Sequence, residues 1–249
     1  MNDKFIIKKL YISNKQITLL TICTVLMLLS YLLDLSNSTK NAGIYYIILL
    51  ASSLIMPLVR VHGAIKCIKY IFFSLLLTSP YYFIVKADNA NNLLSIFIGL
   101  IIGCVLSLFN IKQFKSAILK KTLKSKVSLN FKQKIITIFE MLLTPILEEV
   151  IFRIILISWL FVDFGYISIV ISSILFVLFH YFQEKSKYFY NLKIYLFQFL
   201  LSMILGYLYI STNSILGCIV AHFIFNSWKL IEVINRPVKS NNANLFNDY

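Results

Sequence analysis

Long apolar segments separated by short polar loops dominate this chain. A helix that crosses a bilayer needs about 20 apolar residues, with a range of roughly 17–25, and eight segments approach or reach that length. They lie at residues 17–33, 44–59, 70–85, 93–110, 135–161, 166–182, 194–210 and 215–231. The pattern predicts an all-α fold, a polytopic membrane helix bundle of about eight transmembrane helices.

Basic residues fall between these segments and alternate in number from one loop to the next. Lys and Arg number four in the N-terminal tail, three in the second loop, eight in the fourth, three in the sixth and three at the C-terminal end. The intervening loops carry only Lys40 and Lys86. Because Lys and Arg collect in cytoplasmic loops, this distribution supports eight spans with both termini in the cytoplasm.

The composition excludes most other classes of protein. Of the 249 residues, 59% are apolar or aromatic and 14% are charged, whereas soluble domains have about 45–50% and about 25%. The net charge of +14 does not indicate nucleic-acid binding, since the basic residues form no stripe interleaved with aromatic residues on a solvated face. The four cysteines, Cys23, Cys67, Cys104 and Cys218, lie in or beside apolar runs, as small hydrophobic residues do.

The two halves of the chain differ in polar content. The first four segments contain essentially no ionisable residue, and the pair Gly99 and Gly103 in the fourth indicates a helix-packing surface. We therefore divide the chain into a four-span scaffold at 1–132, a four-span core at 133–235 that contains the polar groups and a solvated tail at 236–249.

Ionisable groups within the membrane cost a few kcal/mol each on insertion scales, and those of this chain are confined to the last four segments. They are Glu140, Glu148, Glu149, Arg153, His180 and His222, with Asn226 as a polar neighbour. Glu149 and Arg153 are four residues apart and share a helical face, and a purely structural ion pair is the commoner role of such a pair. Glu148 is turned about 100° away and remains available for chemistry.

The depth of these groups decides whether they can meet. A straight helix that begins at Lys134 would place Glu148 roughly 20 Å deep, whereas His180 and His222 lie near the cytoplasmic ends of their spans. A membrane helix that begins at Pro145, with residues 131–143 as an interfacial amphipathic helix, would remove this difference. The sequence therefore predicts a break at Pro145 that places Glu148 level with both histidines.

Three motifs in the second half resemble the signature of a known family. They are Glu148-Glu149-x-x-x-Arg153, Phe176-x-x-x-His180 and His222-x-x-x-Asn226. In this order they resemble the CPBP family, the CAAX proteases and bacteriocin-processing (Abi-type) intramembrane proteases, over about residues 135–231.

The resemblance implies a role for each of these residues. Glu148 would activate the attacking water, and His180 would share that water. His222 and Asn226 would hold the developing oxyanion, and Glu149 with Arg153 would support the architecture. Peptide hydrolysis needs a general base and a preorganised charge stabiliser, and this set provides both.

The cofactor is left open by the sequence. Glu148, His180 and His222 are a feasible zinc set with water in the fourth position, as a metalloendopeptidase would have, but the chain has no HExxH motif. Zinc and no metal are therefore both possible, and we favour the metal-independent mechanism.

The leading function is an intramembrane endopeptidase that cleaves a membrane-associated substrate or a peptide precursor near the cytoplasmic face. Its partners would be that substrate and the lipid bilayer, and its location a bacterial plasma membrane. The alternative is a bacteriocin self-immunity or interaction protein that acts without proteolysis. A third function, an ion-coupled transporter, is disfavoured because the halves show no repeat symmetry.

Overall fold

The computed structural model describes residues 14–55, 91–119, 128–182 and 192–238, and these residues are almost entirely helical. The first two helices are α1 (Asn14–Leu32) and α2 (Asn37–Ile55), which pack against each other. Apart from one bridge between Leu129 and Val238, these four ranges contain no strand pairing. The all-α prediction is confirmed, and the predicted span at 70–85 lies outside the described residues.

Helix α2 begins seven residues earlier than its predicted apolar segment. A carboxylate from elsewhere in the chain satisfies the polar residues at this end: Asp163 Oδ2 accepts hydrogen bonds from the Ser36 amide at 3.0 Å and from the Thr39 hydroxyl at 2.5 Å. Because the orphan donors of the first turn have a partner, the helix extends through polar residues that the hydropathy pattern assigns to a loop.

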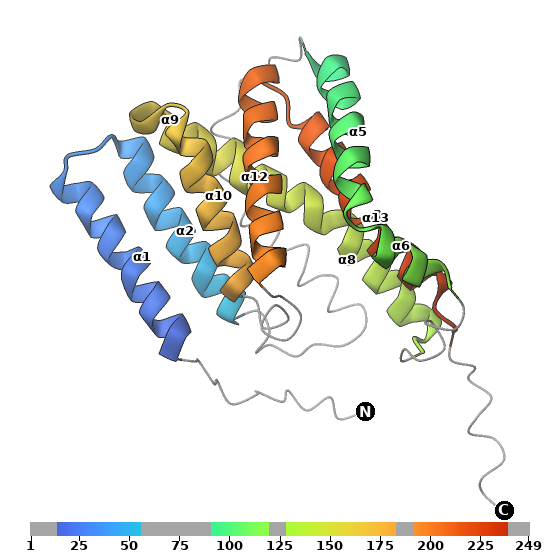
Figure 1. Cartoon of the computed structure of the whole chain (residues 1–249). Helices are drawn as coiled ribbons and strands as arrows, with labels where there is room; N and C mark the ends of the chain where they lie inside the picture. Colours follow the sequence, from blue (N-terminus) through green and yellow to red (C-terminus); the bar gives the residue numbers. More distant parts are fainter. Residues whose placement is uncertain (1–13, 56–90, 120–127, 183–191, 239–249) are drawn as a thin grey trace, which may run out of the picture.

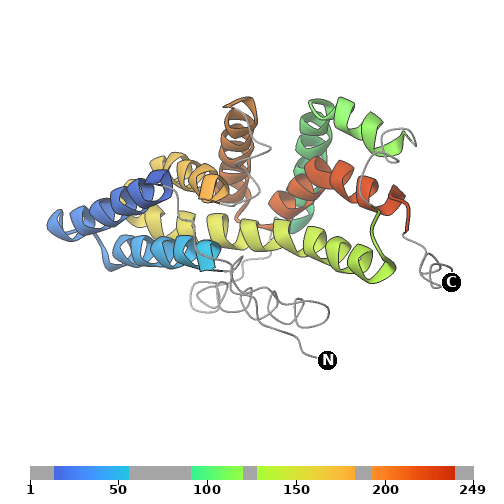
Figure 2. The same ribbon diagram turned by 90° about the horizontal axis from the view of Figure 1, so that it is seen from below.

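One long helical rod runs diagonally across the other helices (Figures 1 and 2). It comprises α8 (Phe131–Glu149), the π-helical segment η1 (Val150–Ile157) and α9 (Ser158–Phe164). Its first turn is closed by a capping box, in which Asn130 and Gln133 exchange side-chain-to-backbone hydrogen bonds of 2.7 and 3.1 Å. The rod ends at Gly165, whose φ of +50° suits glycine.

The predicted break at Pro145 is wrong. Pro145 lies buried inside α8, and the Thr144 hydroxyl donates to the Glu140 carbonyl at 2.7 Å instead of capping a new helix. A proline within a helix costs about 3 kcal/mol, and the packing of α8 against α13 offsets this cost. Residues 131–143 are therefore the first part of the rod and not a separate interfacial helix.

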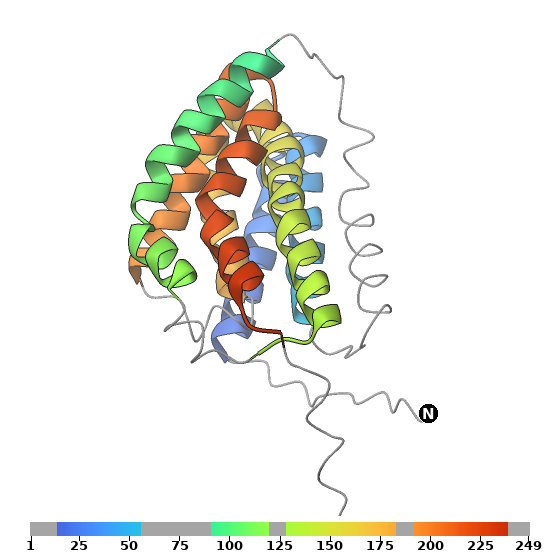
Figure 3. The same ribbon diagram turned by 90° about the vertical axis from the view of Figure 1, so that its right-hand side faces the viewer.

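The remaining helices surround this rod. They are α5 (Asn92–Leu108), α6 (Ile111–Ile118), α10 (Ile167–Phe182), α12 (Leu192–Thr212) and α13 (Leu216–Asn235). Figure 3 shows α13 between α5 on one side and α8 on the other. The sequence prediction treated 111–118 as part of a loop, but the structure forms α6 there, bent by 79° from α5.

Small residues allow α5 and α13 to approach closely. A Cβ atom on Gly99 would lie 2.2 Å from the Gly217 carbonyl oxygen, and one on Gly103 would lie 2.9 Å from Ile224 Cβ. Neither position has room for a side chain unless the helices separate. The packing surface predicted from Gly99 and Gly103 is therefore present, and α13 is its partner.

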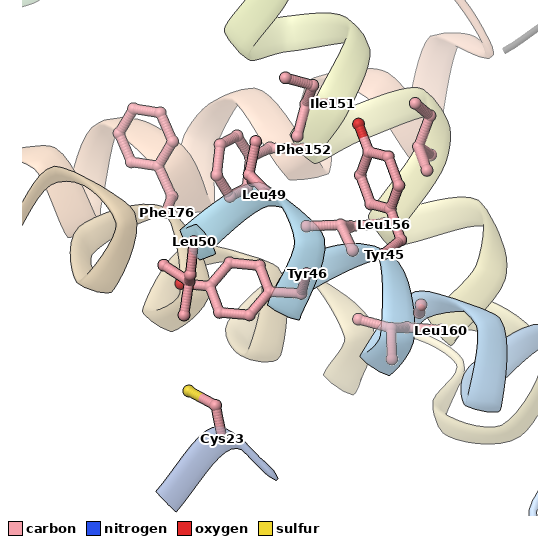
Figure 4. Packing of buried hydrophobic residues seen from close by; sticks show 12 residues of the cluster. Cys23, Tyr45, Tyr46, Leu49, Leu50, Ile151, Phe152, Leu156, Leu160 and Phe176 are labelled. Carbon is pink, nitrogen blue, oxygen red and sulfur yellow. The ribbon is translucent and has the colours of Figure 1, made fainter. Parts of the chain in front are cut away.

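Two apolar clusters lie on either side of the rod's centre. The first joins α1, α2, η1, α9 and α10, and Figure 4 shows its side chains: Cys23, Tyr45, Tyr46, Leu49, Leu50, Ile151, Phe152, Leu156, Leu160 and Phe176. The second joins α5, α12 and α13 through Leu106, Leu201, Leu205, Leu208, Cys218 and Ala221. Segment η1 contributes to the first cluster and also contacts α12, which contributes to the second.

The structure supports a membrane protein by the length and composition of its helices. Leu192–Thr212 and Leu216–Asn235 are long and apolar enough to cross a bilayer, and the bent pair α5 and α6 would count as a third span. Large apolar side chains also lie exposed along the outside of the bundle, as on Leu93, Phe97 and Leu108. The count of eight spans and the orientation of the termini remain predictions.

Candidate active site

A buried carboxylate joins the rod to α13 at the centre of the molecule. Glu149, fully buried at the end of α8, accepts a hydrogen bond from Arg153 Nε at 2.8 Å and pairs with His222 Nδ1 at 2.7 Å. Since an ionised carboxylate only accepts hydrogen bonds, His222 carries its proton on Nδ1. The predicted Glu149–Arg153 pair is therefore present, and it also orients a histidine.

The neighbouring carboxylate faces both histidines. Glu148 Oε2 lies 3.6 Å from His222 Nε2, and Glu148 Oε1 lies 3.8 Å from His180 Nε2. These separations exceed hydrogen-bond length, but a water oxygen can lie about 2.8 Å from both atoms of either pair, beside the line that joins them. The three side chains meet as the sequence predicted, without the break at Pro145.

The course of the rod explains how Glu148 reaches the histidines. A straight helix parallel to its neighbours would place Glu148 far from the histidines, whereas α8 lies diagonally across the other helices (Figure 1). Consecutive carboxylates point about 100° apart on a helix, so Glu148 faces α10 and α13 while Glu149 pairs within the rod and with α13. The π-helical turns begin directly after this pair, a position common for π-bulges at functional sites.

An aromatic ring packs between the basic groups of the site. Phe176, buried one turn before His180 on α10, has its ring centroid 4.5 Å from the His180 ring and 6.4 Å from the His222 ring. The Arg153 guanidinium carbon lies 5.7 Å from the same centroid. Phe176 therefore restricts the rings of both histidines and the position of Arg153.

Ser202 is a site residue that the sequence reasoning missed. Its hydroxyl on α12 accepts a hydrogen bond from Arg153 Nη1 at 2.8 Å, and both groups are fully buried. A single serine in an apolar span carries no signal that separates it from serines that only bond their own helix. Ser202 is identified as a site residue because its partner, Arg153, lies on another helix, and only the tertiary structure shows this contact.

Two further residues continue the His222 face of α13. Asn226 lies one turn after His222 and is half-buried, and within the described ranges no hydrogen bond to its amide is formed. Lys229 follows one turn after Asn226 on the same helix. The sequence reasoning treated Lys229 only as a signal of membrane orientation.

The positions of the possible zinc ligands bear on the metal alternative. Glu148, His180 and His222 converge, yet among the described residues no group of three or more His, Cys, Asp or Glu side chains is arranged so that it could hold a metal ion. His222 Nδ1 is bonded to Glu149, and its Nε2 atom faces Glu148. The donor set does not form a zinc site in this arrangement, and the reaction below is derived without one.

Comparison with known proteins identifies the region that carries this site. Residues 130–228 match the family model described as type II CAAX prenyl endopeptidase Rce1-like. No curated protein and no solved structure matches the chain. The matched region includes Glu148, Glu149, Arg153, His180, His222 and Asn226, and this similarity supports the CAAX protease family predicted from the three motifs.

Proposed function

We propose that this protein is an intramembrane endopeptidase that hydrolyses a peptide bond in a membrane-associated or peptide-precursor substrate. The observation that carries the proposal is the Glu148 carboxylate with the Nε2 atoms of two histidines at 3.6 and 3.8 Å. A carboxylate and two imidazoles around one small space are suited to bind and deprotonate a water molecule. The match to a CAAX protease family supports the same reaction class.

The attack step uses Glu148 as general base. Water held by Glu148 and His180 gives a proton to Glu148 as its oxygen bonds to the peptide carbonyl carbon, and the carbonyl π electrons move to the oxygen. The oxyanion then accepts hydrogen bonds from His222 Nε2–H, when that ring carries both protons, and from the Asn226 amide. Glu148 returns its proton to the amide nitrogen, and the C–N bond breaks to release an amine and a carboxylic acid.

Glu149 and Arg153 act in this proposal as positioning residues. Glu149 fixes the ring plane of His222 through the 2.7 Å contact to Nδ1, and its charge stabilises the imidazolium that faces the oxyanion. Arg153 neutralises Glu149 within a fully buried environment, and Ser202 holds Arg153. Buried carboxylates of this kind need such partners, since an unpaired charge there costs several kcal/mol.

Substitution of the general base tests the proposal. The full-length protein, reconstituted in vesicles with a panel of membrane-anchored peptides, should release fragments identifiable by mass spectrometry. Glu148→Gln should lower the rate by at least about 100-fold, since general-base catalysis contributes about 10²–10⁴. Glu140→Gln, a similar change two turns earlier on the same helix, is the matched control. Equal cleavage by the Glu148→Gln variant and the wild type would refute the proposal.

The metal question needs its own measurement. We favour a metal-independent reaction, in which chelation of the active, purified protein leaves the rate unchanged and elemental analysis finds less than one zinc per chain. Stoichiometric zinc that is lost together with activity would instead assign Glu148, His180 and His222 as its ligands.

The alternative function, bacteriocin self-immunity or interaction without proteolysis, makes a different prediction. A protein that protects by binding keeps its effect when Glu148 becomes Gln, because the side chain keeps its size and polarity. Loss of protection in the Glu148→Gln variant, with its membrane level unchanged, favours the protease.

We further propose that the division of the chain and its placement in the membrane follow the sequence prediction. The scaffold would comprise residues 1–132, the catalytic core 133–235 and the tail 236–249, with eight spans in the plasma membrane of a bacterium. Both termini and the site would then lie toward the cytoplasm, in agreement with the distribution of Lys and Arg.

A further inference from the structure

The elbow between α5 and α6 presents a mixed basic and apolar surface. Helix α6 leaves α5 at 79°, and five of its side chains are exposed: Ile111, Lys112, Gln113, Lys115 and Ile118. At 100° per residue, all of these positions except Gln113 fall within about 120° of arc on one side of the helix. Ala117, fully buried, lies on the opposite side.

The buried side of α6 is fixed to α13. Asn235 Nδ2 on α13 donates to the Ala117 carbonyl at 3.2 Å, and Asn110 Nδ2 at the elbow donates to the Phe225 carbonyl at 3.4 Å. These two bonds hold α6 at both ends. The exposed arc is therefore a fixed surface of the fold, directed away from the helix that carries His222.

The charge of this part of the sequence has one sign. Residues 111–134 contain eight lysines and no aspartate or glutamate. Lys134 is bonded to the carbonyls of Ile234 and Arg236, whereas Lys112 and Lys115 extend from the exposed arc beside Ile111 and Ile118. An anionic partner complements the lysines, and the isoleucines, 49% and 60% exposed, require that this partner also offer apolar contact.

A membrane surface rich in anionic lipid has both properties. We propose that α6 lies in the membrane–water interface, where Lys112 and Lys115 bind the phosphate groups of anionic phospholipids and Ile111 and Ile118 enter the acyl boundary. If apolar α5 crosses the bilayer, the 79° bend directs α6 almost along the membrane plane. This binding site is separate from the proposed peptidase reaction and does not depend on it.

Quenching by brominated lipids can test the contact at α6 itself. The full-length Ile118→Trp variant is reconstituted in vesicles of phosphatidylcholine with about 30% phosphatidylglycerol, an anionic lipid. In one preparation the phosphatidylglycerol is brominated, and in the other the phosphatidylcholine is brominated. Fluorescence of the parent protein, which contains two Trp, is subtracted. We expect brominated phosphatidylglycerol to quench the fluorescence of the introduced tryptophan more strongly, per mole of brominated lipid, than brominated phosphatidylcholine does.

Paired lysine substitutions separate a local site from diffuse charge attraction. Each lysine near an anionic surface contributes roughly a fivefold preference, so Lys112→Gln with Lys115→Gln should abolish the extra quenching. Lys132→Gln with Lys193→Gln removes two exposed lysines outside α6 and should preserve most of the extra quenching. The proposal fails if the two pairs of lysine substitutions lower the extra quenching by phosphatidylglycerol equally, or if neither pair lowers it. It also fails if neither brominated lipid quenches the introduced tryptophan. Circular dichroism and gel filtration of each variant confirm that the fold is retained.

Discussion

Glu149 is the residue on which the geometry of the candidate site depends. It contacts Arg153 on its own helix and His222 on α13, and all three groups are buried. Because the contact to His222 uses Nδ1, the Nε2 atom faces Glu148. One carboxylate thus stabilises the fold and orients a reacting group, and substitutions should affect both stability and rate.

Replacement of Glu149 by Gln should therefore be costly in two measurements. It leaves Arg153 without a buried counter-charge, so we expect a loss of about 3–5 kcal/mol in the free energy of unfolding. The cleavage rate should fall about 10- to 100-fold as the orientation of His222 relaxes. Thermal unfolding in detergent and cleavage assays in vesicles measure the two effects.

Ser202→Ala provides the matched control for Glu149→Gln. It removes one hydrogen bond from Arg153 and keeps the ion pair, so the loss of stability should be only about 0.5–1.5 kcal/mol. A larger loss for Ser202→Ala than for Glu149→Gln would contradict the central position given to Glu149.

Phe176 should act on the reaction rate more than on substrate binding. Phe176→Leu keeps an apolar side chain but removes the ring that packs on His180 at 4.5 Å. We expect a lower kcat with little change in KM, because the histidines lose their fixed orientation. Phe161→Leu, a similar change at a ring 39% exposed on α9, should leave both constants near the wild-type values. The account is contradicted if the two variants behave alike.

At the scale of the elements, contacts between helices far apart in sequence place the site residues. Helix α13, which carries His222, packs against the rod on one side and against α5 on the other, where Gly99 and Gly217 let the two backbones touch. The position of α2 against α9 depends on hydrogen bonds from Ser36 and Thr39 to Asp163. Both contacts can be changed by a single substitution.

Gly99→Ala should separate α5 from α13. The added Cβ would lie 2.2 Å from the Gly217 carbonyl oxygen, so the loss of stability should reach at least the about 1–3 kcal/mol typical of overpacking. Gly43→Ala is the control, because the atom nearest to its Cβ would be Cγ of the flexible Met27 side chain, at 3.0 Å. That change should be neutral or mildly stabilising, since alanine favours a helix by about 1 kcal/mol over glycine. Equal thermal stability of the two variants would contradict the packing described.

Asp163 should make stability depend on acidic pH. Hydrogen bonds from Thr39 and Ser36 hold the pKa of this exposed carboxyl, which lies outside the predicted spans, below its usual range. The contribution of the ionised Asp163 carboxylate to the free energy of unfolding is therefore fully present above the unfolded-state pKa of about 3.9. It is lost as the pH falls through the lower folded-state pKa.

Asp163→Asn should remove this part of the pH dependence. Unfolding temperatures measured between about pH 3 and 6 should then fall less steeply on acidification than those of the wild type. Asp34→Asn, at a fully exposed carboxylate in the turn before α2, should behave as the wild type does. If the Asp163→Asn curve follows the wild-type curve, the carboxylate does not contribute as described.

For the whole molecule, the sequence was sufficient for the class of fold and for the chemical groups of the site. Apolar length and the scarcity of charge indicate a helical membrane protein, and each acid, Arg or His within a span stands out because it is costly there. Helical spacing also gives the Glu149–Arg153 pair correctly, because the partners are only four residues apart.

Features that depend on tertiary contacts could not be predicted in this way. The continuation of the rod through Pro145 depends on packing against α13, and the role of Ser202 depends on a partner 49 residues away. A helix parallel to its neighbours would separate Glu148 from the histidines in depth, but α8 runs diagonally across the other helices (Figure 2) and brings these side chains together. Local spacing contains no information on the angle between helices.

The most direct measurement of the central claim is peptide-bond hydrolysis in water labelled with ¹⁸O. The reconstituted wild-type protein should release a fragment whose new carboxylate contains one labelled oxygen, because water activated at Glu148 attacks the carbonyl carbon. The Glu148→Gln variant, folded and present at the same level, should release about 100-fold less of this fragment. Undiminished release of the labelled fragment by that variant would contradict the assignment of Glu148 as the base and, with it, the proposed reaction.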